Sequence, residues 1–204
     1  SGLNTSCPSS TDLKHVTINA PPEISLEAPP SGCTGEHIFF NALGAKDPDG
    51  DILEYYWSFG DGTILRGDAE VSHAYEVGGT YQVSLIVDDK KGTSCSTATA
   101  TQTILINTPP QAHAGVNQSC CVDVAATFDA SASTDADQNP LSYTWDFGDG
   151  TLVHQAIASH TYKQNGTFDV TLTVNDNSGT SCSTSIDSFT TEINTTPVPV
   201  INIR

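Results

Sequence analysis

The fold of this chain is decided by the stretch Tyr55-Tyr56-Trp57-Ser58-Phe59-Gly60-Asp61-Gly62-Thr63, which returns as Tyr143-Thr144-Trp145-Asp146-Phe147-Gly148-Asp149-Gly150-Thr151. Both tryptophans of the protein lie in these two copies, 88 residues apart. Aromatic residues alternate with other residues, so three of them share one face of an extended strand. The Gly-Asp-Gly that follows predicts a tight turn, because glycine adopts positive φ and aspartate binds the amides of its own turn. We therefore predict the buried central strand of a sheet-on-sheet domain, present twice.

The repeat continues well beyond this strand. His73-Ala74-Tyr75 corresponds to His160-Thr161-Tyr162, and residues 79–87 correspond to residues 166–174. A period of this length is that of a whole domain and not of a short solenoid repeat. The alternating residues that we expect to face the two cores from the second strands are Ile38, Phe40 and Ala42 in the first copy, and Val124, Ala126 and Phe128 in the second.

The order W-x-F-G-D-G, H-x-Y and G-x-[YF]-x-V-x-L-x-V-x-D resembles the motif string of the polycystic kidney disease (PKD) domain. The resemblance covers nearly the whole chain. It implies an all-β fold of two tandem immunoglobulin-like β-sandwiches with additional terminal strands, and an extracellular module with a binding or spacer role. Ser58 stands where the second copy has Asp146, at an outward position that does not affect the fold.

Charge and hydropathy exclude several partners. The chain has 24 acidic and 7 basic residues, which give a formal net charge of -17. This charge argues against nucleic acid and against an anionic membrane surface, and it favours cations. No apolar run is long enough to span a bilayer, so membrane insertion is not expected.

We expect the ends of the chain to contain parts of further repeats. Residues 5–22 align without a gap onto residues 93–110, which lead through the last strand of the first copy. We therefore divide the chain into residues 1–20 (the last strand of a preceding repeat, or a donor strand), 21–107 (first PKD domain), 108–194 (second PKD domain) and 195–204 (the start of a following repeat, or a linker). An unpaired strand seeks a sheet. The terminal strands therefore belong either to a longer PKD array or to a filament built by strand donation between copies.

The six cysteines recur in two kinds of position. Those ahead of the second strand are Cys33, Cys120 and Cys121, and those that open a last strand are Cys7, Cys95 and Cys182. Because these two segments run side by side in sandwiches of the PKD type, we predict the disulfides Cys33–Cys95 and Cys121–Cys182. Cys120 is an alternative partner to Cys121. Cys7 and the remaining cysteine pair across a repeat or subunit boundary, or Cys7 lacks its partner. Disulfides indicate a location outside the cytoplasm, extracellular or at the cell surface.

An acidic loop between the second and third strands presents alternate oxygen ligands in both copies. Its candidate ligands are Asp47, Asp49 and Asp51 in the first copy, and Asp135, Asp137 and Asn139 in the second. In a sandwich this loop shares one end of the domain with Asp89 or Asp176 and with the incoming linker. Ca²⁺ accepts six to eight oxygens in flexible geometry, so calcium is the expected cofactor, and PKD domains that bind calcium resemble this arrangement. The alternative is ordinary turn chemistry, with carboxylates that bind amides and face water.

Catalysis is not expected. His73 and His160 precede a tyrosine by two residues and are expected to bind the neighbouring Gly-Asp-Gly turn. Nothing in the sequence places an activated nucleophile beside a base.

Three apolar residues of the first copy are expected to point outward: Tyr56, Ile86 and, from the other sheet, Phe39. The first two have threonine counterparts, Thr144 and Thr173. They are candidates for a contact with another subunit, a glycan or an extracellular protein, although single exposed apolar residues are also ordinary. Candidate glycosylation sites in N-x-[ST] sequons are Asn4, Asn117, Asn165 and Asn194.

Two functions follow from these observations. The first is a non-enzymatic structural or adhesion module of a surface or fibre-forming protein, which polymerises by terminal strand exchange and is stiffened by Ca²⁺. The second is an accessory module of a secreted hydrolase that binds a polysaccharide or protein substrate.

Overall fold

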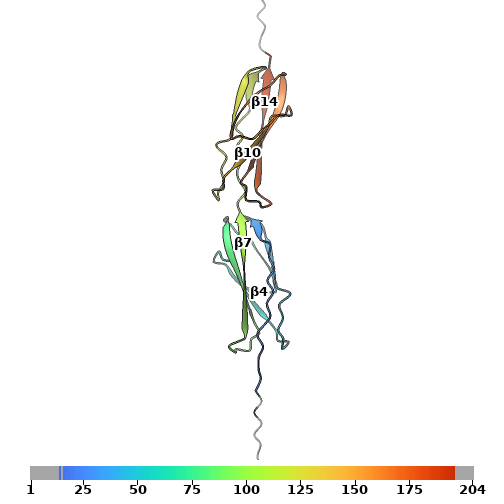
Figure 1. Ribbon diagram of the computed structural model, residues 1–204, viewed down its shortest axis with the longest axis vertical. Helices are drawn as coiled ribbons and strands as arrows, with labels where there is room; N and C mark the ends of the chain where they lie inside the picture. The colour runs from blue at the N-terminus through green and yellow to red at the C-terminus, as the bar shows by residue number, and fades with distance from the viewer. Residues whose placement is uncertain (1–13, 15, 196–204) are drawn as a thin grey trace, which may run out of the picture.

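The computed structural model describes residue 14 and residues 16–195. It contains two β-sandwiches stacked end to end along one long axis (Figure 1). Strands and their connections account for this whole part of the chain, which confirms the predicted all-β tandem fold. None of the described segments forms a helix with the length and apolarity needed to cross a bilayer.

The first domain has a five-stranded sheet and a two-stranded sheet. The larger sheet has the order β1 (Ser31–Cys33), β7 (Thr97–Asn107), β6 (Gly79–Asp88), β3 (Glu54–Ser58) and β4 (Ile64–Gly67). The smaller sheet pairs β2 (Ile38–Asn41) with β5 (Glu70–His73). Strand β1 runs parallel to β7, and the other pairs are antiparallel. Ahead of β1 the described residues make only two isolated bridges, Glu23 with Lys46 and Glu27 with Asn41.

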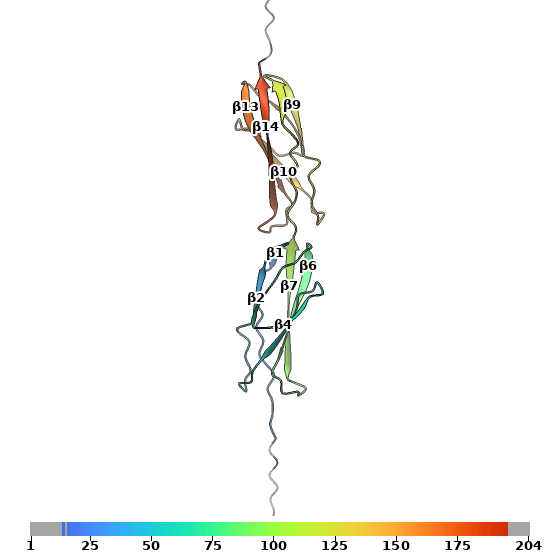
Figure 2. The same ribbon diagram turned by 180° about the vertical axis from the view of Figure 1, so that it is seen from behind.

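The second domain repeats this topology. Its larger sheet has the order β11 (Leu152–Val153), β10 (Ser142–Asp146), β13 (Gly166–Asn175), β14 (Thr184–Asn194) and β8 (Gln118–Cys121). Its smaller sheet pairs β12 (Ile157–Thr161) with β9 (Ala125–Asp129). Here β8 runs parallel to β14, as β1 does to β7. Figure 2 shows strands β9, β10, β13 and β14 of this domain from behind.

Each core is built around its tryptophan, and Trp57 and Trp145 are both 0% exposed, as the sequence predicts. Trp57 packs against Phe40 and Phe59 in the first domain. Its Nε1 donates to the Asp68 carbonyl at 3.1 Å, whereas Trp145 Nε1 has no hydrogen-bond partner among the described residues. The second copy is one residue shorter between its tryptophan and histidine, and β11 has two residues where β4 has four. We attribute the missing hydrogen bond to this deletion.

The Gly-Asp-Gly turn takes the predicted form. Gly60 has a φ of 85°, and a Cβ on it would stand 2.8 Å from the Gln82 carbonyl oxygen, so only glycine fits. Asp61 accepts hydrogen bonds from the Thr63 amide at 2.9 Å and from His73 Nε2 at 2.7 Å. The second domain has the same bond between His160 and Asp149, at 2.8 Å. The expected role of both histidines is confirmed.

One residue predicted to lie in the core, Val124, is not buried. The predicted terminal strands are largely untested. Val124 is 48% exposed because it lies in the turn before β9, so the inward alternation begins at Ala126. Residues 16–20 are not part of a strand. Most of the segments 1–20 and 195–204, including Cys7 and Asn4, lies outside the described residues.

The predicted disulfide pairing is also wrong, because the structure joins Cys33 to Cys182 across the two domains. The parallel register places Cys33 beside Asn107, at the end of β7, whereas Cys95 precedes the start of that strand. The 11 residues of β7 separate the two cysteines by about 35 Å. Cys121 and Cys182 are kept apart by β14 in the same way. Among the cysteines that the structure describes, Cys95, Cys120 and Cys121 are free thiols.

Candidate functional site at the domain junction

Asn107 is the residue on which the junction is centred. It is the last residue of β7 and is 2% exposed. Its carbonyl accepts a hydrogen bond from the Thr34 amide in the first domain at 2.9 Å. Its Nδ2 donates to Asp176 Oδ2 in the second domain at 2.8 Å. One side chain therefore ties the end of the first sandwich to the β13–β14 turn of the second.

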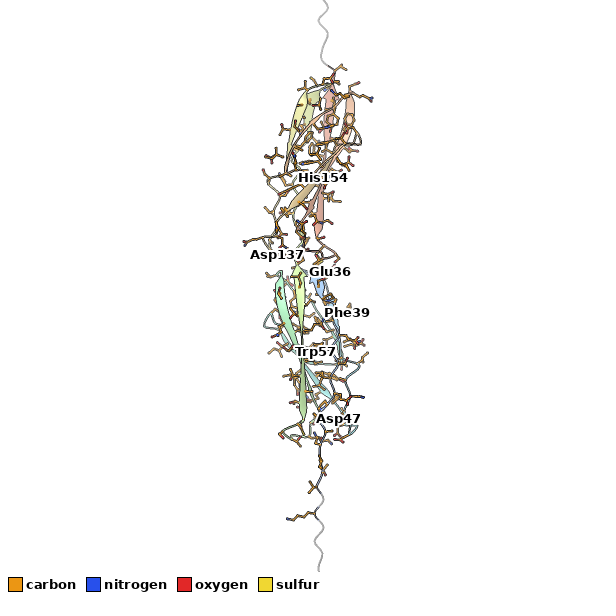
Figure 3. The ribbon with its side chains drawn as sticks, viewed as in Figure 1. Glu36, Phe39, Asp47, Trp57, Asp137 and His154 are labelled. Carbon is orange, nitrogen blue, oxygen red and sulfur yellow. A yellow bond between two sulfur atoms is a disulfide. The ribbon has the colours of Figure 1, made fainter. Side chains whose placement is uncertain are left out.

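The next residue continues the contact. Thr108 donates to the Asp137 carboxylate from its amide at 2.6 Å and from its hydroxyl at 3.1 Å. Figure 3 shows Asp137 at the boundary between the two domains. On the other side of this carboxylate lies Gly78 of the first domain, where a Cβ would approach the Asp137 side chain closer than 3.0 Å. The absence of a side chain at Gly78 therefore permits this contact.

The disulfide fastens the same junction. The Cα atoms of Cys33 and Cys182 lie 6.2 Å apart, and Ser181 Oγ lies 3.3 Å from Cys33 Sγ. The linker that follows Asn107 contains Pro109 and Pro110, whose φ angles are fixed. Two covalent connections thus cross the junction, which restricts rotation between the domains.

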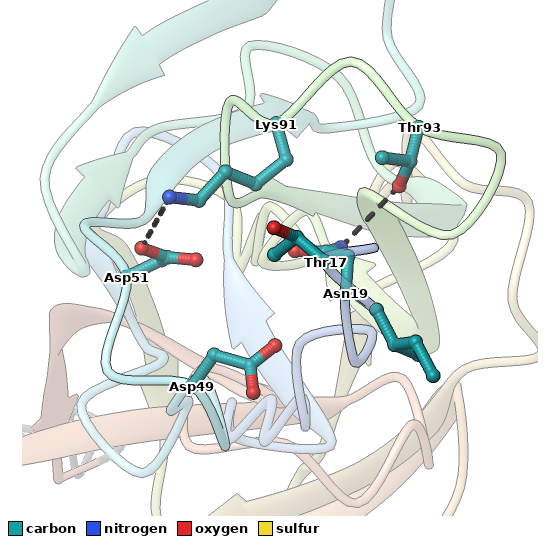
Figure 4. A pocket seen from close by; sticks show the side chains of 7 residues that line it. Thr17, Asn19, Asp49, Asp51, Lys91 and Thr93 are labelled. Atoms are coloured by element: carbon teal, nitrogen blue, oxygen red, sulfur yellow. Dashed lines mark hydrogen bonds and ion pairs between the residues drawn. The ribbon is translucent and has the colours of Figure 1, made fainter. Parts of the chain in front are cut away.

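The outer end of the first domain repeats much of this arrangement (Figure 4). Asn19 Nδ2 donates to Asp89 Oδ2 at 2.7 Å, and the Ala20 amide donates to Asp49 Oδ2 at 2.8 Å. Burial raises the pKa of the Asp89 carboxyl, but hydrogen bonds from Asn19 and the Lys91 amide outweigh this effect and lower the pKa below its ordinary value. The acidic loop, Asp89 and the incoming linker therefore converge as the sequence predicts.

The acidic loops present oxygen donors of the kind that bind a hard cation. Carboxylate oxygens of Asp47, Asp49 and Asp51 lie within 4.8 Å of one another. Asp47 Oδ1 accepts from the backbone amides of Asp49 and Asp51, but its Oδ2 is buried and has no hydrogen-bond partner in the described part of the chain. Asp135 Oδ2 in the second domain is likewise buried and has no hydrogen-bond partner among the described residues. Water or a cation can satisfy a buried carboxylate oxygen that lacks a donor, and a donor set of oxygens alone is of the kind that Ca²⁺ accepts.

Two observations refine the predicted ligand sets. Asp89 and Asp176 bind the linker asparagines. The close group of carboxylate oxygens in the first domain does not include Asp89. In the first domain Lys91 Nζ lies 2.7 Å from Asp51 Oδ1, so this site already contains a positive charge (Figure 4). The second domain has Ser178 at the position of Lys91. The acidic loop of the second domain ends at Asn139, whose backbone N–H donates to Asp135 Oδ1 at 2.9 Å.

The outward residues form two separate surfaces in the first domain. Tyr56 on β3 lies directly opposite Ile86 on β6, and the Arg66 guanidinium lies 5.6 Å from the centre of the tyrosine ring. Tyr56 also donates to Glu54 at 2.8 Å. Hydrogen bonds from Lys90, Tyr56 and Arg66 lower the pKa of Glu54 to about 2. We call Tyr56, Ile86 and Arg66 the outer sheet patch.

Phe39, on β2 of the other sheet, is 73% exposed. It lies beside a shallow hollow of about 320 Å³ that Glu70 and Val71 also line. The sequon asparagines that the structure describes, Asn117, Asn165 and Asn194, are all exposed. Asn117 Oδ1 accepts from the Thr190 amide at 3.1 Å.

Sequence reasoning missed two contacts that join the domains, the one between Gly78 and Asp137 and the Cys33–Cys182 disulfide. Gly78 has Asn165 as its counterpart, so the repeat gives no signal for it. The cysteines of the Cys33–Cys182 bond recur at equivalent positions of each copy, which is a signal in the sequence. Only the direction of the strands shows that the two cysteines meet across a junction.

The fold and the junction define a class of protein: a tandem β-sandwich module whose domains are joined end to end. The PKD domain family matches residues 19–104 and 107–191, and the chain belongs to this family. Because PKD domains account for nearly all of the described residues, the chain is a non-enzymatic module.

Two curated relatives and one solved structure show the range of the similarity. Collagenase ColQ1 of Bacillus cereus (strain Q1) is 45% identical over 76 residues, which are 36% of this chain and 8% of the collagenase. The pre-pro-metalloprotease PrtV of Vibrio cholerae serotype O1 is 32% identical over 139 residues, 66% of this chain and 14% of PrtV. The crystal structure of the PKD1 domain of Vibrio anguillarum Epp is 30% identical and covers 45% of this chain and 100% of that domain, with a TM-score of 0.38. The chain thus spans only a small part of the two curated relatives.

Proposed function

We propose that this chain is a stiff spacer and binding module of a secreted hydrolase, with an extracellular location. The observation that carries the proposal is the junction, where the Cys33–Cys182 bond and the buried Asn107 hold two sandwiches in one line. A disulfide that closes a junction between domains persists in an oxidising compartment, which favours an extracellular setting.

The relatives support the accessory role. They are a collagenase and a metalloprotease in which the similarity covers 8% and 14% of the sequence, so most of each protein lies outside the matched part. We infer that the catalytic part of the protein that carries this chain lies elsewhere, and that the module holds it against an insoluble protein or polysaccharide substrate.

The outer sheet patch is the proposed contact with that substrate. Tyrosine and arginine are enriched at the centres of interfaces, since both offer a large contact area and a polar group. The second domain has Thr144 and Thr173 in place of Tyr56 and Ile86. Binding is therefore assigned to the first domain and spacing to the second.

Calcium is the proposed stiffening ion. Bound at Asp135 and Asp137, it would neutralise the buried Asp135 Oδ2 and hold the acidic loop that Thr108 and Gly78 contact. The ion would thus help to fix the position of the second domain relative to the first. We propose no catalytic role for it.

A pull-down on insoluble collagen, chitin and cellulose tests the binding role. The unsubstituted chain is expected to be retained on one of these matrices, and Tyr56→Ala to reduce retention at least about fivefold, the loss of one interface anchor. Thr144→Ala, at the equivalent place in the second domain, is the matched control and is expected to bind normally. Equal retention of Tyr56→Ala and the unsubstituted chain would show that the outer sheet patch is not the contact.

A structural role in a surface fibre is the second candidate. The repetition of junction residues at the outer end of the first domain favours it, because that end carries Asn19 and Asp89 in the arrangement of Asn107 and Asp176. Strand exchange through residues 1–19 predicts polymers that grow with protein concentration and disappear when those residues are removed. Light scattering of the full chain and of the chain without residues 1–19, each over a concentration series, tests for these polymers.

A further inference from the structure

The far end of the second domain repeats the end of the first domain that carries Cys33. Cys121 lies in register with Asn194 across the parallel pair β8–β14, as Cys33 does with Asn107 across β1–β7. In both domains the amide that follows this cysteine donates to the asparagine carbonyl at 2.9 Å. The backbone position that bears the disulfide at Cys33 is therefore present again at Cys121.

The turn that follows is repeated as well. The Gly35 amide donates to the Tyr75 carbonyl at 2.9 Å, and the Asp123 amide donates to the Tyr162 carbonyl at 3.0 Å. The neighbouring Cys120 packs against the hydrophobic core of the second domain. Since adjacent residues of a strand point to opposite faces, Cys121 is the thiol that corresponds to Cys33.

The complementary half of a junction is present at the outer end of the first domain. Cys95 Sγ lies 3.2 Å from the Asn19 carbonyl oxygen, and Cys182 Sγ lies 3.6 Å from the Asn107 carbonyl oxygen. In both domains the aspartate that binds the linker asparagine also donates from its amide to a serine carbonyl at 3.0 Å. Cys95 thus occupies the environment in which Cys182 is disulfide-bonded.

We propose that these two ends are halves of further junctions of the same kind. Cys121 pairs with the cysteine at the Cys182 position of a following PKD repeat, and Cys95 pairs with the cysteine at the Cys33 position of a preceding one. The Cys33–Cys182 bond is the observed example of this contact. The inference goes beyond the proposed function, because it concerns what joins one repeat to the next and not what the module binds.

The bond forms by thiol–disulfide exchange. Two protein thiols give up two protons and two electrons, one sulfur–sulfur bond forms between them, and a small disulfide such as oxidised glutathione is reduced to two thiols. The free thiol state of Cys95 and Cys121 is the starting point of this reaction.

The far end of the second domain differs from the observed junction at the place of Gly78. Gly78 contacts Asp137 across the junction, whereas the second domain has Asn165 at that place. A carboxylate that arrives there must move aside, and the Asn165 amide can donate a hydrogen bond to it. We therefore expect a junction at this end that forms the same disulfide with a smaller equilibrium constant than Cys33–Cys182.

A three-repeat chain tests the proposal. A second copy of residues 108–194 is appended directly after Asn194, so that Asn194 takes the place of Asn107, and Cys7→Ser removes the cysteine outside the described residues. The protein is equilibrated with oxidised and reduced glutathione, and its disulfides are mapped by mass spectrometry. We expect the Cys33–Cys182 bond and a second bond between Cys121 and the appended copy of Cys182.

Matched variants separate the outcomes. Cys120→Ser is expected to leave both bonds intact, Cys121→Ser to remove only the second, and Asn165→Gly to raise the equilibrium constant of the second bond several-fold. The Cys33–Cys182 bond reports that each chain has folded. The proposal is overturned if Cys121 remains a thiol while that bond forms, if Cys120 is bonded instead, or if the second bond forms only with Asn165→Gly.

Discussion

Gly78 of the first domain and Asp137 of the second lie against each other, so that a single Cβ at Gly78 would overlap with the Asp137 carboxylate. The two residues belong to different sandwiches and meet only because Asn107 and the Cys33–Cys182 bond fix how the domains dock. The junction is therefore a fitted contact with its own side-chain requirements.

Gly78→Ala should weaken the junction without affecting either core. The added methyl group displaces Asp137 and lowers the effective concentration of Cys33 near Cys182. We expect the equilibrium constant for the disulfide against glutathione to fall at least about fivefold, the size of coupling found between contacting residues. Gly67→Ala is the control, because its Cβ would meet its neighbours at an ordinary 3.5 Å. Asp137→Ala should restore the equilibrium in the Gly78→Ala background, and a failure to do so would contradict the proposed clash.

Asp61→Asn should change how the stability of the first domain depends on pH. Burial raises the pKa of Asp61, but bonds from Thr63 and His73 outweigh it, so the pKa lies below its ordinary value. A carboxyl with a lowered folded-state pKa stabilises the fold above its unfolded pKa, near 3.9, and loses this effect as the pH falls through the folded value.

The Tm difference between the unsubstituted chain and Asp61→Asn should therefore be complete at about pH 5 and shrink toward about pH 2. Calorimetry over this range measures it. Asp68→Asn is the control, since the Asp68 carboxylate has no hydrogen bond within the described part of the chain. A difference that stays constant with pH would contradict the role of the Asp61 carboxylate.

Trp57→Phe should destabilise its domain more than Trp145→Phe destabilises the other. Both substitutions remove the same volume from a fully buried site, but only Trp57 loses a hydrogen bond, the one to the Asp68 carbonyl. The difference should be about 1 kcal/mol. Hydrogen exchange of β6 and of β13 reports the two stabilities separately. Equal losses would show that the Trp57 hydrogen bond contributes nothing net.

Lys91→Ser should strengthen calcium binding by the first domain. The Lys91 ammonium lies 2.7 Å from Asp51 Oδ1 and competes with a cation, whereas the second domain has Ser178 at this place. Calorimetric titration should show tighter binding to the second site than to the first, with Asp135→Asn abolishing the second.

Lys90→Ser is the control for this titration. It removes the same charge, but Lys90 pairs with Glu54 and not with the acidic loop. If Lys90→Ser and Lys91→Ser change the calcium affinity equally, the cause is the net charge of the protein and not the contact between Lys91 and Asp51.

Much of the fold could be predicted from the sequence, because its signals are local. The alternation around Trp57 and Trp145, the glycines of the turn and the His73–Asp61 bond depend on residues that are close in the sequence or repeated at one offset. The convergence of Asp49 and Asp89 at the linker follows from sandwich topology. These features recur in both copies, so each copy supports the interpretation of the other.

The tertiary structure alone decided how the two domains are joined. The sequence places Cys33 and Cys95 beside strands that pair with each other, but a disulfide needs sulfurs at the same end of those strands. The parallel pairing of β1 with β7 separates them and turns Cys33 toward the next domain. Likewise, the need for glycine at position 78 arises from Asp137, a residue of another sandwich. Local patterns determine each domain by itself, whereas contacts between domains depend on which surfaces meet, and that is a property of the folded chain.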